Sequence, residues 1–143
     1  MILYCELTSY RDEKPALGRL QDETYEPIYD SLKEMERLKV SKFATLFDEH
    51  DAGNLAIISE LVESLSVERL VALELAAALL KSTSLALLMM RDKLTVGQAF
   101  DKSRLEERFQ IELFGEIEES HKFDELTNYS QLIAVKLFWD LNN

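Results

Sequence analysis

Apolar residues recur three or four positions apart along most of the chain, the spacing that places them on one face of a helix. Strict alternation, which indicates a strand, is weak and confined to residues 1–14. Residues 40–47 have a mixed pattern that fits either a short strand or a loop. The ranges with helical spacing are 25–38, 55–65, 67–81, 82–91, 95–100, 105–121 and 125–141. The pattern therefore predicts an all-α fold, a single compact domain of about six helices with a short extended N-terminal segment.

Residues that suit helix N-caps stand before several of these ranges, and each can supply an oxygen to a free backbone N–H group. The expected caps are Thr24, Ser66, Thr95, Ser103 and Asp124. Gln98 lies three residues after Thr95, so this pair can form a capping box. Glu106 stands in the same relation to Ser103. With Thr24 as the cap, Pro27 falls in the first helical turn, where its missing N–H group does no harm.

Residues 67–81 are apolar on nearly every side, so we expect them to form the central, most buried helix. Glu74 and Lys81 are two turns apart and share its narrow polar stripe. The stretch 70–90 is also the nearest approach in the chain to a membrane span. Each of these two charges would cost roughly 2.5–3.5 kcal/mol in the middle of a bilayer. The pattern therefore favours helices buried in protein, and we expect no membrane insertion.

The spacing is most regular over residues 105–121, where Leu105, Phe109, Leu113 and Ile117 recur at every fourth position. Such an apolar stripe lets a helix dock on its own protein. Polar and aromatic side chains flank it, with Glu106, Gln110 and Phe114 on one side and Glu112 and Glu116 on the other. Gly115 interrupts the pattern, although glycine in a helix interior costs about 1 kcal/mol relative to alanine. Close approach of another backbone, a kink or the helix end would each explain it.

The charge of the chain limits its partners. With 16 basic and 27 acidic residues the formal net charge is −11, which argues against nucleic acid and against an anionic membrane surface. The charge suits a basic protein partner, although solubility alone accounts for it as well. Cys5 is the only cysteine, so an internal disulfide is ruled out and a reducing compartment fits.

Candidate chemistry is sparse, and we expect neither a metal nor another cofactor. Glu118 and His121 have the Glu-x-x-His spacing of di-iron bundles, but such sites need a second pair, and Phe47 precedes the only other histidine, His50, by three positions. Two histidines and one distant cysteine do not suit zinc. A phosphate-binding glycine loop and a nucleophile elbow are both missing from the sequence. The sequence therefore predicts a protein that is not an enzyme. His121 by itself is typical of a helix end, where it complements the C-terminal dipole.

The stretch LEERFQIELFGEIEESH resembles the C-terminal motif of the assembly chaperones that hold the alpha subunit of the ATP synthase F1 head. That family reads Leu-Glu, then Gln, then Trp-Gly-Glu-x-Glu, then His. The matching positions are Leu105, Glu106, Gln110, Phe114, Gly115, Glu116, Glu118 and His121. A weaker match covers Tyr10, Arg11, Leu17 or Leu20, Gln21 and Pro27. The chain departs from the family at Phe114, usually tryptophan, and at Lys122, where an acidic residue often stands.

The resemblance implies a chaperone that binds the free F1 alpha subunit and shields its beta-facing surface until the head assembles. The partner-binding residues it implies are Gln110, Glu112, Phe114, Gly115, Glu116, Glu118 and His121. Phe114 suits the core of the fold equally well. Glu106 lies near the middle of the apolar stripe, so we expect it to be half-buried and paired with Arg11. That ion pair suits a role in holding the fold at least as well as a role in partner contact.

The resemblance covers the chain from about residue 6 to residue 141, and residues 1–143 correspond to the helical C-terminal-type domain of that family. The family's N-terminal β-rich domain has no counterpart here, as expected of a fragment or of a naturally short form. Family members work in the mitochondrial matrix of eukaryotes or in the cytoplasm of bacteria. The alternative function is a non-catalytic helical interaction module with the same fold and a different client.

Overall fold

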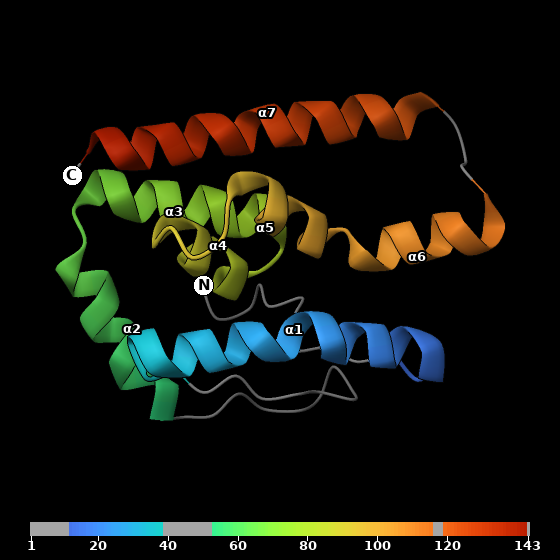
Figure 1. Cartoon of the computed structure of the whole chain (residues 1–143). Coiled ribbons are helices and arrows are strands. Elements are labelled where there is room, and N and C mark those ends of the chain that lie inside the picture. The colour runs from blue at the N-terminus through green and yellow to red at the C-terminus, as the bar shows by residue number, and fades with distance from the viewer. Residues whose placement is uncertain (1–11, 39–52, 116–118, 143) are drawn as a thin grey trace.

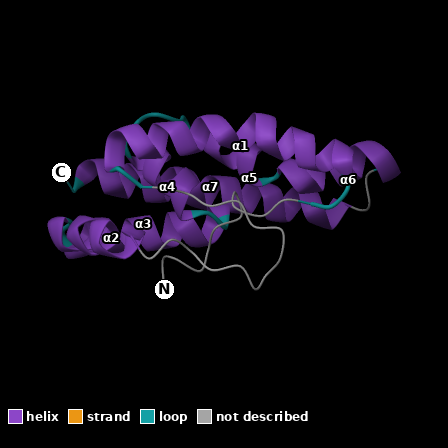
Figure 2. Cartoon of the chain, turned by 90° about the horizontal axis from the view of Figure 1, so that it is seen from below, coloured by secondary structure: helices purple, strands orange, loops and turns teal. Residues whose placement is uncertain are grey.

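The computed structural model describes residues 12–38, 53–115 and 119–142. These residues form seven α-helices joined by loops and turns, and no strand occurs among them (Figure 2). The expected all-α fold is confirmed. The expected extended segment at 1–11 and the strand or loop at 40–47 lie outside the described residues. The helices are α1 (Pro15–Glu36), α2 (Gly53–Ser64), α3 (Val67–Leu80), α4 (Thr83–Met90), α5 (Val96–Ser103), α6 (Leu105–Phe114) and α7 (Glu119–Leu141).

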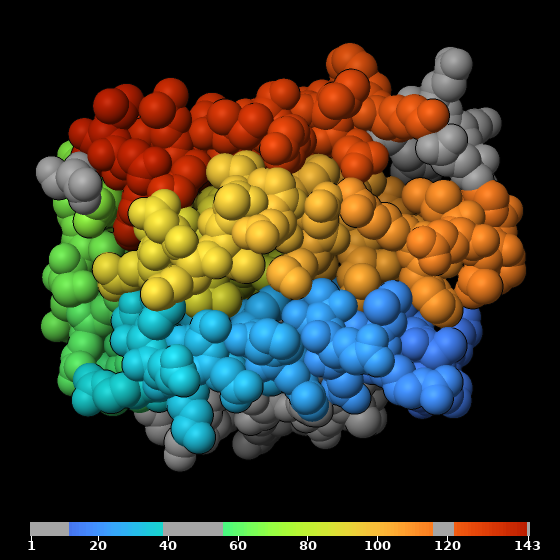
Figure 3. All heavy atoms as spheres, in the orientation of Figure 1, coloured from blue at the N-terminus to red at the C-terminus, as the bar shows by residue number. Residues whose placement is uncertain are grey.

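The helices are arranged around a central group made of α3, α4 and α5. In Figure 1, α7 runs along one side of this group and α1 along the opposite side. The short helix α2 lies at one end of the molecule, and α6 extends at the other end. On the face seen in Figure 3, the surfaces of α5 and α6 separate α1 from α7. The molecule therefore has a core in its middle, with α2 and α6 at opposite ends.

The most buried helix is α4, and the expectation that residues 67–81 fill this place is wrong. Every residue from Ser84 to Met90 is buried, and α4 contacts α1, α3, α5 and α7. By contrast, α3 leaves Val67, Val71 and Leu75 exposed and buries a face rich in alanine. An apolar sequence shows that a helix tolerates burial, but the number of neighbouring helices decides how much of it is covered.

The first helix begins ten residues earlier than its sequence pattern indicates. α1 starts at Pro15, which occupies the first turn, so Thr24 does not cap a helix and Pro27 lies in the helix interior. Pro27 is on the exposed face, where water can bind the carbonyl that its missing N–H group leaves free. The apolar pattern indicated a later helix start because Gln21, a polar residue, occupies the buried position one turn before Tyr25.

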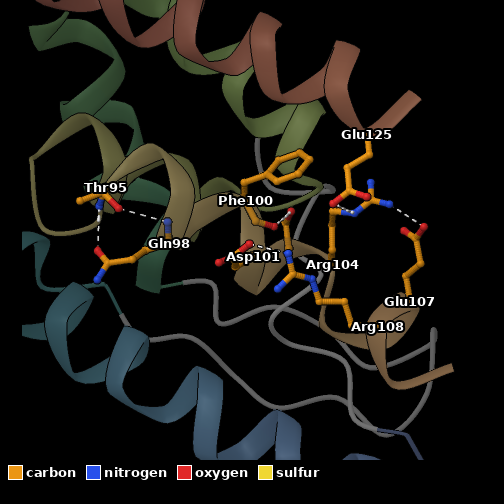
Figure 4. Close-up of polar contacts among 9 residues, drawn as sticks. Thr95, Gln98, Phe100, Asp101, Arg104, Glu107, Arg108 and Glu125 are labelled. Carbon is orange, nitrogen blue, oxygen red and sulfur yellow. Dashed lines mark hydrogen bonds and ion pairs between the residues drawn. The ribbon is translucent and has the colours of Figure 1, made fainter. Parts of the chain in front are cut away.

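The helix starts at Ser66 and Thr95 are confirmed. The Ser66 hydroxyl accepts a hydrogen bond from the Arg69 N–H group at 3.3 Å. Thr95 and Gln98 form the predicted capping box, with N–H groups donating at 3.1 Å and 2.9 Å (Figure 4). In the part of the chain that the structure describes, no helix is both long and apolar enough to cross a membrane.

Candidate functional site

The stretch expected to form one continuous helix is divided between two. α6 ends at Phe114, and Gly115 follows with φ +80° and ψ 167°, a backbone conformation open almost only to glycine. The Gly115 N–H group closes the last turn by donating to the Ile111 carbonyl at 2.8 Å. Of the three explanations for Gly115, the helix end is therefore correct. His121 lies in the first turn of α7 rather than at a C-terminal end, so its interpretation as a dipole complement is wrong.

The start of α6 also differs from the prediction. Ser103 does not cap it, because the Ser103 hydroxyl belongs to α5 and donates to the Phe100 carbonyl at 2.7 Å. Arg104 alone separates α5 from α6. Asp124, the expected cap of a helix from residue 125, lies inside α7, which begins at Glu119. Local sequence favoured these caps, but Ser103 is the last residue of α5 and Asp124 lies within α7.

Arg104 holds the junction between α5, α6 and α7 (Figure 4). Its guanidinium lies 2.5 Å from the Glu107 carboxylate on α6 and 3.6 Å from the Glu125 carboxylate on α7. It also lies 5.4 Å from the centre of the Phe100 ring on α5, within the range of a cation–π contact. Its side chain is only 14% exposed, so water screens these charges little. Sequence analysis missed this residue, because a lone arginine between two helices carries no motif.

Glu106 is half-buried and paired, as expected, but the partner that the structure describes is Gln21. The Gln21 side-chain amide donates to the Glu106 carboxylate at 2.7 Å, and the Gln21 carbonyl oxygen accepts from the Asp12 N–H group at 2.8 Å. Gln21 is fully buried, so the two bonds satisfy side-chain polar atoms that would destabilise the fold if they were buried without partners. The predicted partner, Arg11, lies outside the described residues.

The remainder of α6 lies at the surface of the protein. None of its ten residues is buried, and its apolar stripe is only partly covered, with Leu105 and Phe109 half-buried and Leu113 57% exposed. Ile117 lies outside the described residues. The structure therefore supports the docking stripe only for the first two turns of the helix.

Three predicted partner-binding residues lie in the exposed last turns of α6, with Gln110 and Phe114 on one side of the helix and Glu112 on the other. Gln110 and Glu112 are exposed, and Phe114 is 73% exposed, so this ring is not part of the core. We refer to these three residues as the α6 edge. Gly115 ends the helix beside them. Glu116 and Glu118 lie outside the described residues, and of His121 only the backbone is described.

In the described residues, no three histidine, cysteine, aspartate or glutamate side chains gather as metal ligands. The α6 edge offers an exposed aromatic ring with an amide one turn before it on the same side, and a carboxylate on the other side of the helix. These groups suit contact with a protein surface, where aromatic rings supply buried area and polar groups supply orientation.

Solved structures identify the fold. The crystal structure of Atp12 from Paracoccus denitrificans superposes with a TM-score of 0.89 and 27% sequence identity, covering 98% of this chain. The chain shares the fold of Atp12, and its sequence is similar to that of the Paracoccus protein. A structure of the same Paracoccus protein with one aspartate replaced by lysine superposes with a TM-score of 0.86 and 27% identity. Both comparisons cover 60% of the Paracoccus chain, so this chain spans less than two thirds of the length of those Atp12 proteins.

A third structure, a candidate chaperone from Agrobacterium tumefaciens, superposes with a TM-score of 0.83. Its identity is 21%, and the match covers 96% of this chain and 52% of that one, so this likeness concerns the fold alone. No family model matches the sequence. The Atp12 fold places the two sequence segments with family resemblance side by side, because Gln21 on α1 contacts Glu106 on α6.

Proposed function

We propose that this chain is an ATP synthase assembly chaperone that binds the free F1 alpha subunit. It shields the beta-facing surface of that subunit until the F1 head assembles. The observation that carries the proposal is the 27% identity to Atp12 over 98% of the chain, together with the motif residues on α6. An isolated subunit exposes a large apolar surface meant for its neighbour, and a chaperone that covers it prevents aggregation.

The proposed contact is the α6 edge, continued by Gly115, Glu116, Glu118 and His121. Phe114 would supply the apolar anchor, because an exposed ring of this size gains most from burial in a partner. Glu112, Glu116 and Glu118 would pair with basic groups of the client, in keeping with the net charge of −11. The site of action would be the mitochondrial matrix in a eukaryote or the cytoplasm in a bacterium.

The test is retention of purified F1 alpha subunit by this chain, with F1 beta subunit as the negative client. We expect the chain to retain alpha and not beta. Phe114→Ala and Glu116→Lys should each weaken retention at least about tenfold, as loss of an interface anchor does. Glu34→Lys is the matched control, because it makes the same charge change at an exposed position of α1, far from the α6 edge.

The possible results separate the claims. If Phe114→Ala and Glu116→Lys both bind alpha as well as the unchanged chain and the Glu34→Lys control do, the proposed contact at the α6 edge and Glu116 is wrong although the function stands. If a well-folded chain retains no alpha subunit, the chaperone assignment for this chain fails. The alternative, a helical interaction module with another client, then takes its place.

A further inference from the structure

A groove lies between α5, α6 and the first turns of α7. Its volume is about 540 Å³, within the range of pockets that bind ligands. Phe100, Leu126 and Tyr129 provide its apolar surface, and Asp101, Arg108, Lys122 and Glu125 contribute charged groups. Arg108 belongs to α6, so the groove and the α6 edge share one helix.

The groove has a preformed aromatic wall. The Phe100 and Tyr129 rings lie 5.2 Å apart between centroids with their planes tilted by 54°, an arrangement in which aromatic rings attract one another. Phe100 is buried, and Arg104 stacks near its ring while reaching Glu125 on α7. These contacts hold α5 and α7 at a set distance, so the space between them does not depend on a partner.

Gly97 is part of the groove wall, and neither its backbone nor its neighbours require glycine. Its φ lies outside the left-handed region, and a Cβ atom there would lie 3.6 Å from the Tyr129 hydroxyl oxygen, an ordinary contact distance. Glycine in a helix costs about 1 kcal/mol relative to alanine. What Gly97 does provide is space, because any longer side chain at this position would extend into the groove.

The charges around the groove are largely matched. Asp101 pairs with Arg108 at 2.5 Å, and Glu125 pairs with Arg104 at 3.6 Å. Lys122, the remaining cation of the lining, also has an interaction partner. An anion would have to compete with the existing partners of these cations, so the groove suits an uncharged apolar group. A second copy of the chain would bring another net charge of −11, which opposes self-association.

We propose that this groove receives one large apolar side chain of the client polypeptide, such as leucine, isoleucine, methionine or phenylalanine. The inference rests on the proposed function and gives it a second contact point. Glu112 lies one turn from Arg108 on the same side of α6, so a client segment that contacts Glu112 continues past Arg108 into the groove. The groove then anchors the segment, and the acidic α6 edge selects its charge.

The test fills the groove without disturbing the fold. Gly97→Leu places a branched apolar side chain in the groove, and Gly97→Ala adds only the Cβ atom that the structure accommodates. Ala134→Leu adds the same bulk at an exposed position of α7 that does not line the groove. Affinity for purified F1 alpha subunit and the melting temperature are measured for the full chain and for each variant.

We expect Gly97→Leu to weaken alpha binding at least about tenfold, since burial of one large apolar side chain accounts for a change of this size. Its melting temperature should equal or exceed that of the unchanged chain. The affinities of Gly97→Ala and Ala134→Leu for the alpha subunit should be within twofold of the affinity of the unchanged chain. A photo-crosslinking residue in place of Leu126, an exposed groove residue, should link to the alpha subunit, and the same residue in place of Ala134 should not.

Binding by Gly97→Leu within twofold of the unchanged chain would overturn the groove assignment and leave the chaperone function intact. Equal losses in Gly97→Leu and Ala134→Leu would also overturn it, because they would indicate a general effect of added bulk. A change in sedimentation of Gly97→Leu with unchanged alpha binding would identify a second copy as the occupant and reject the client segment. If the unchanged, folded chain does not bind alpha, the proposed function and the groove assignment both fail.

Discussion

The Gln21 side-chain amide donates a hydrogen bond to the Glu106 carboxylate at 2.7 Å, across 85 positions of sequence. This bond joins the second turn of α1 to the first turn of α6. Within the described residues α6 packs mainly against α1, and α6 itself has no buried residue. The pair therefore positions the start of the helix that carries the α6 edge.

Replacement of Gln21 by leucine should destabilise the fold by about 1–3 kcal/mol, because it leaves the Glu106 carboxylate and the Asp12 N–H group without this partner. Urea unfolding followed by circular dichroism measures the change. Glu106→Gln is the control, because the amide oxygen of the new glutamine still accepts the hydrogen bond. This variant should lose less than about 1 kcal/mol of unfolding free energy. Equal losses in the two variants would show that the charge of Glu106 matters more than the bond.

Gly115 and Gly97 should respond oppositely to alanine. Gly115 has φ +80° with no atom within 4 Å of an added Cβ, so Gly115→Ala should cost about 1–3 kcal/mol through backbone strain alone. Gly97 has an ordinary backbone and room for a Cβ atom, so Gly97→Ala should stabilise the protein by up to about 1 kcal/mol. Thermal melts of the two variants make the comparison. Destabilisation by both would contradict the account of Gly97.

Arg104 and Arg108 are both paired but differ in burial. The Arg104 side chain is 14% exposed and reaches two carboxylates, so Arg104→Ala should cost about 1–3 kcal/mol. Arg108 is 49% exposed and bonds Asp101 at the surface, so Arg108→Ala should change stability by less than about 0.5 kcal/mol. Hydrogen–deuterium exchange should become faster in α6 for the first variant only. Similar exchange in both would mean that Arg104 does not hold the junction.

Lys136 on α7 should give the stability a dependence on alkaline pH. Burial alone would lower the pKa of its ammonium group, but hydrogen bonds and charges from Asp140 and Asp92 outweigh this and raise the pKa above 10.5. The lysine Nζ atom lies 2.5 Å from Asp140 and 2.9 Å from Asp92. A raised pKa means that the stabilisation is complete below pH 10.5 and is lost as the pH rises through the pKa of the folded state.

Lys136→Met should therefore lower stability by up to about 1 kcal/mol at pH 7, because both aspartates are largely exposed. The difference in unfolding free energy between Lys136→Met and the unchanged chain should stay constant to about pH 10 and shrink at higher pH. Urea unfolding at pH 7, 9, 10 and 11 measures this. Lys93→Met, an exposed position next to Asp92, is the control and should show no such trend. A difference that persists at pH 11 would indicate lost side-chain packing rather than lost charge.

Much of the candidate site followed from the spacing of residues on one helix. Periodicity placed Gln110 and Phe114 on the same side of α6, and the structure leaves both exposed. The prediction that Glu106 is paired also held. Its observed partner could not be deduced from periodicity, because a hydrogen bond between residues 85 positions apart depends on how two helices meet. The groove beside α6 was missed for the same reason, since it is bounded by three helices.

The sequence by itself determined the all-α class, the caps at Ser66 and Thr95 and the likeness to a chaperone family, because these depend on local spacing and residue type. Only the tertiary structure decided that α4 rather than α3 is the buried centre, since burial depends on the four helices that contact α4. It also decided where helices end. Gly115 stops α6, whereas Pro27 does not stop α1, because a proline on an exposed face loses only a bond that water replaces.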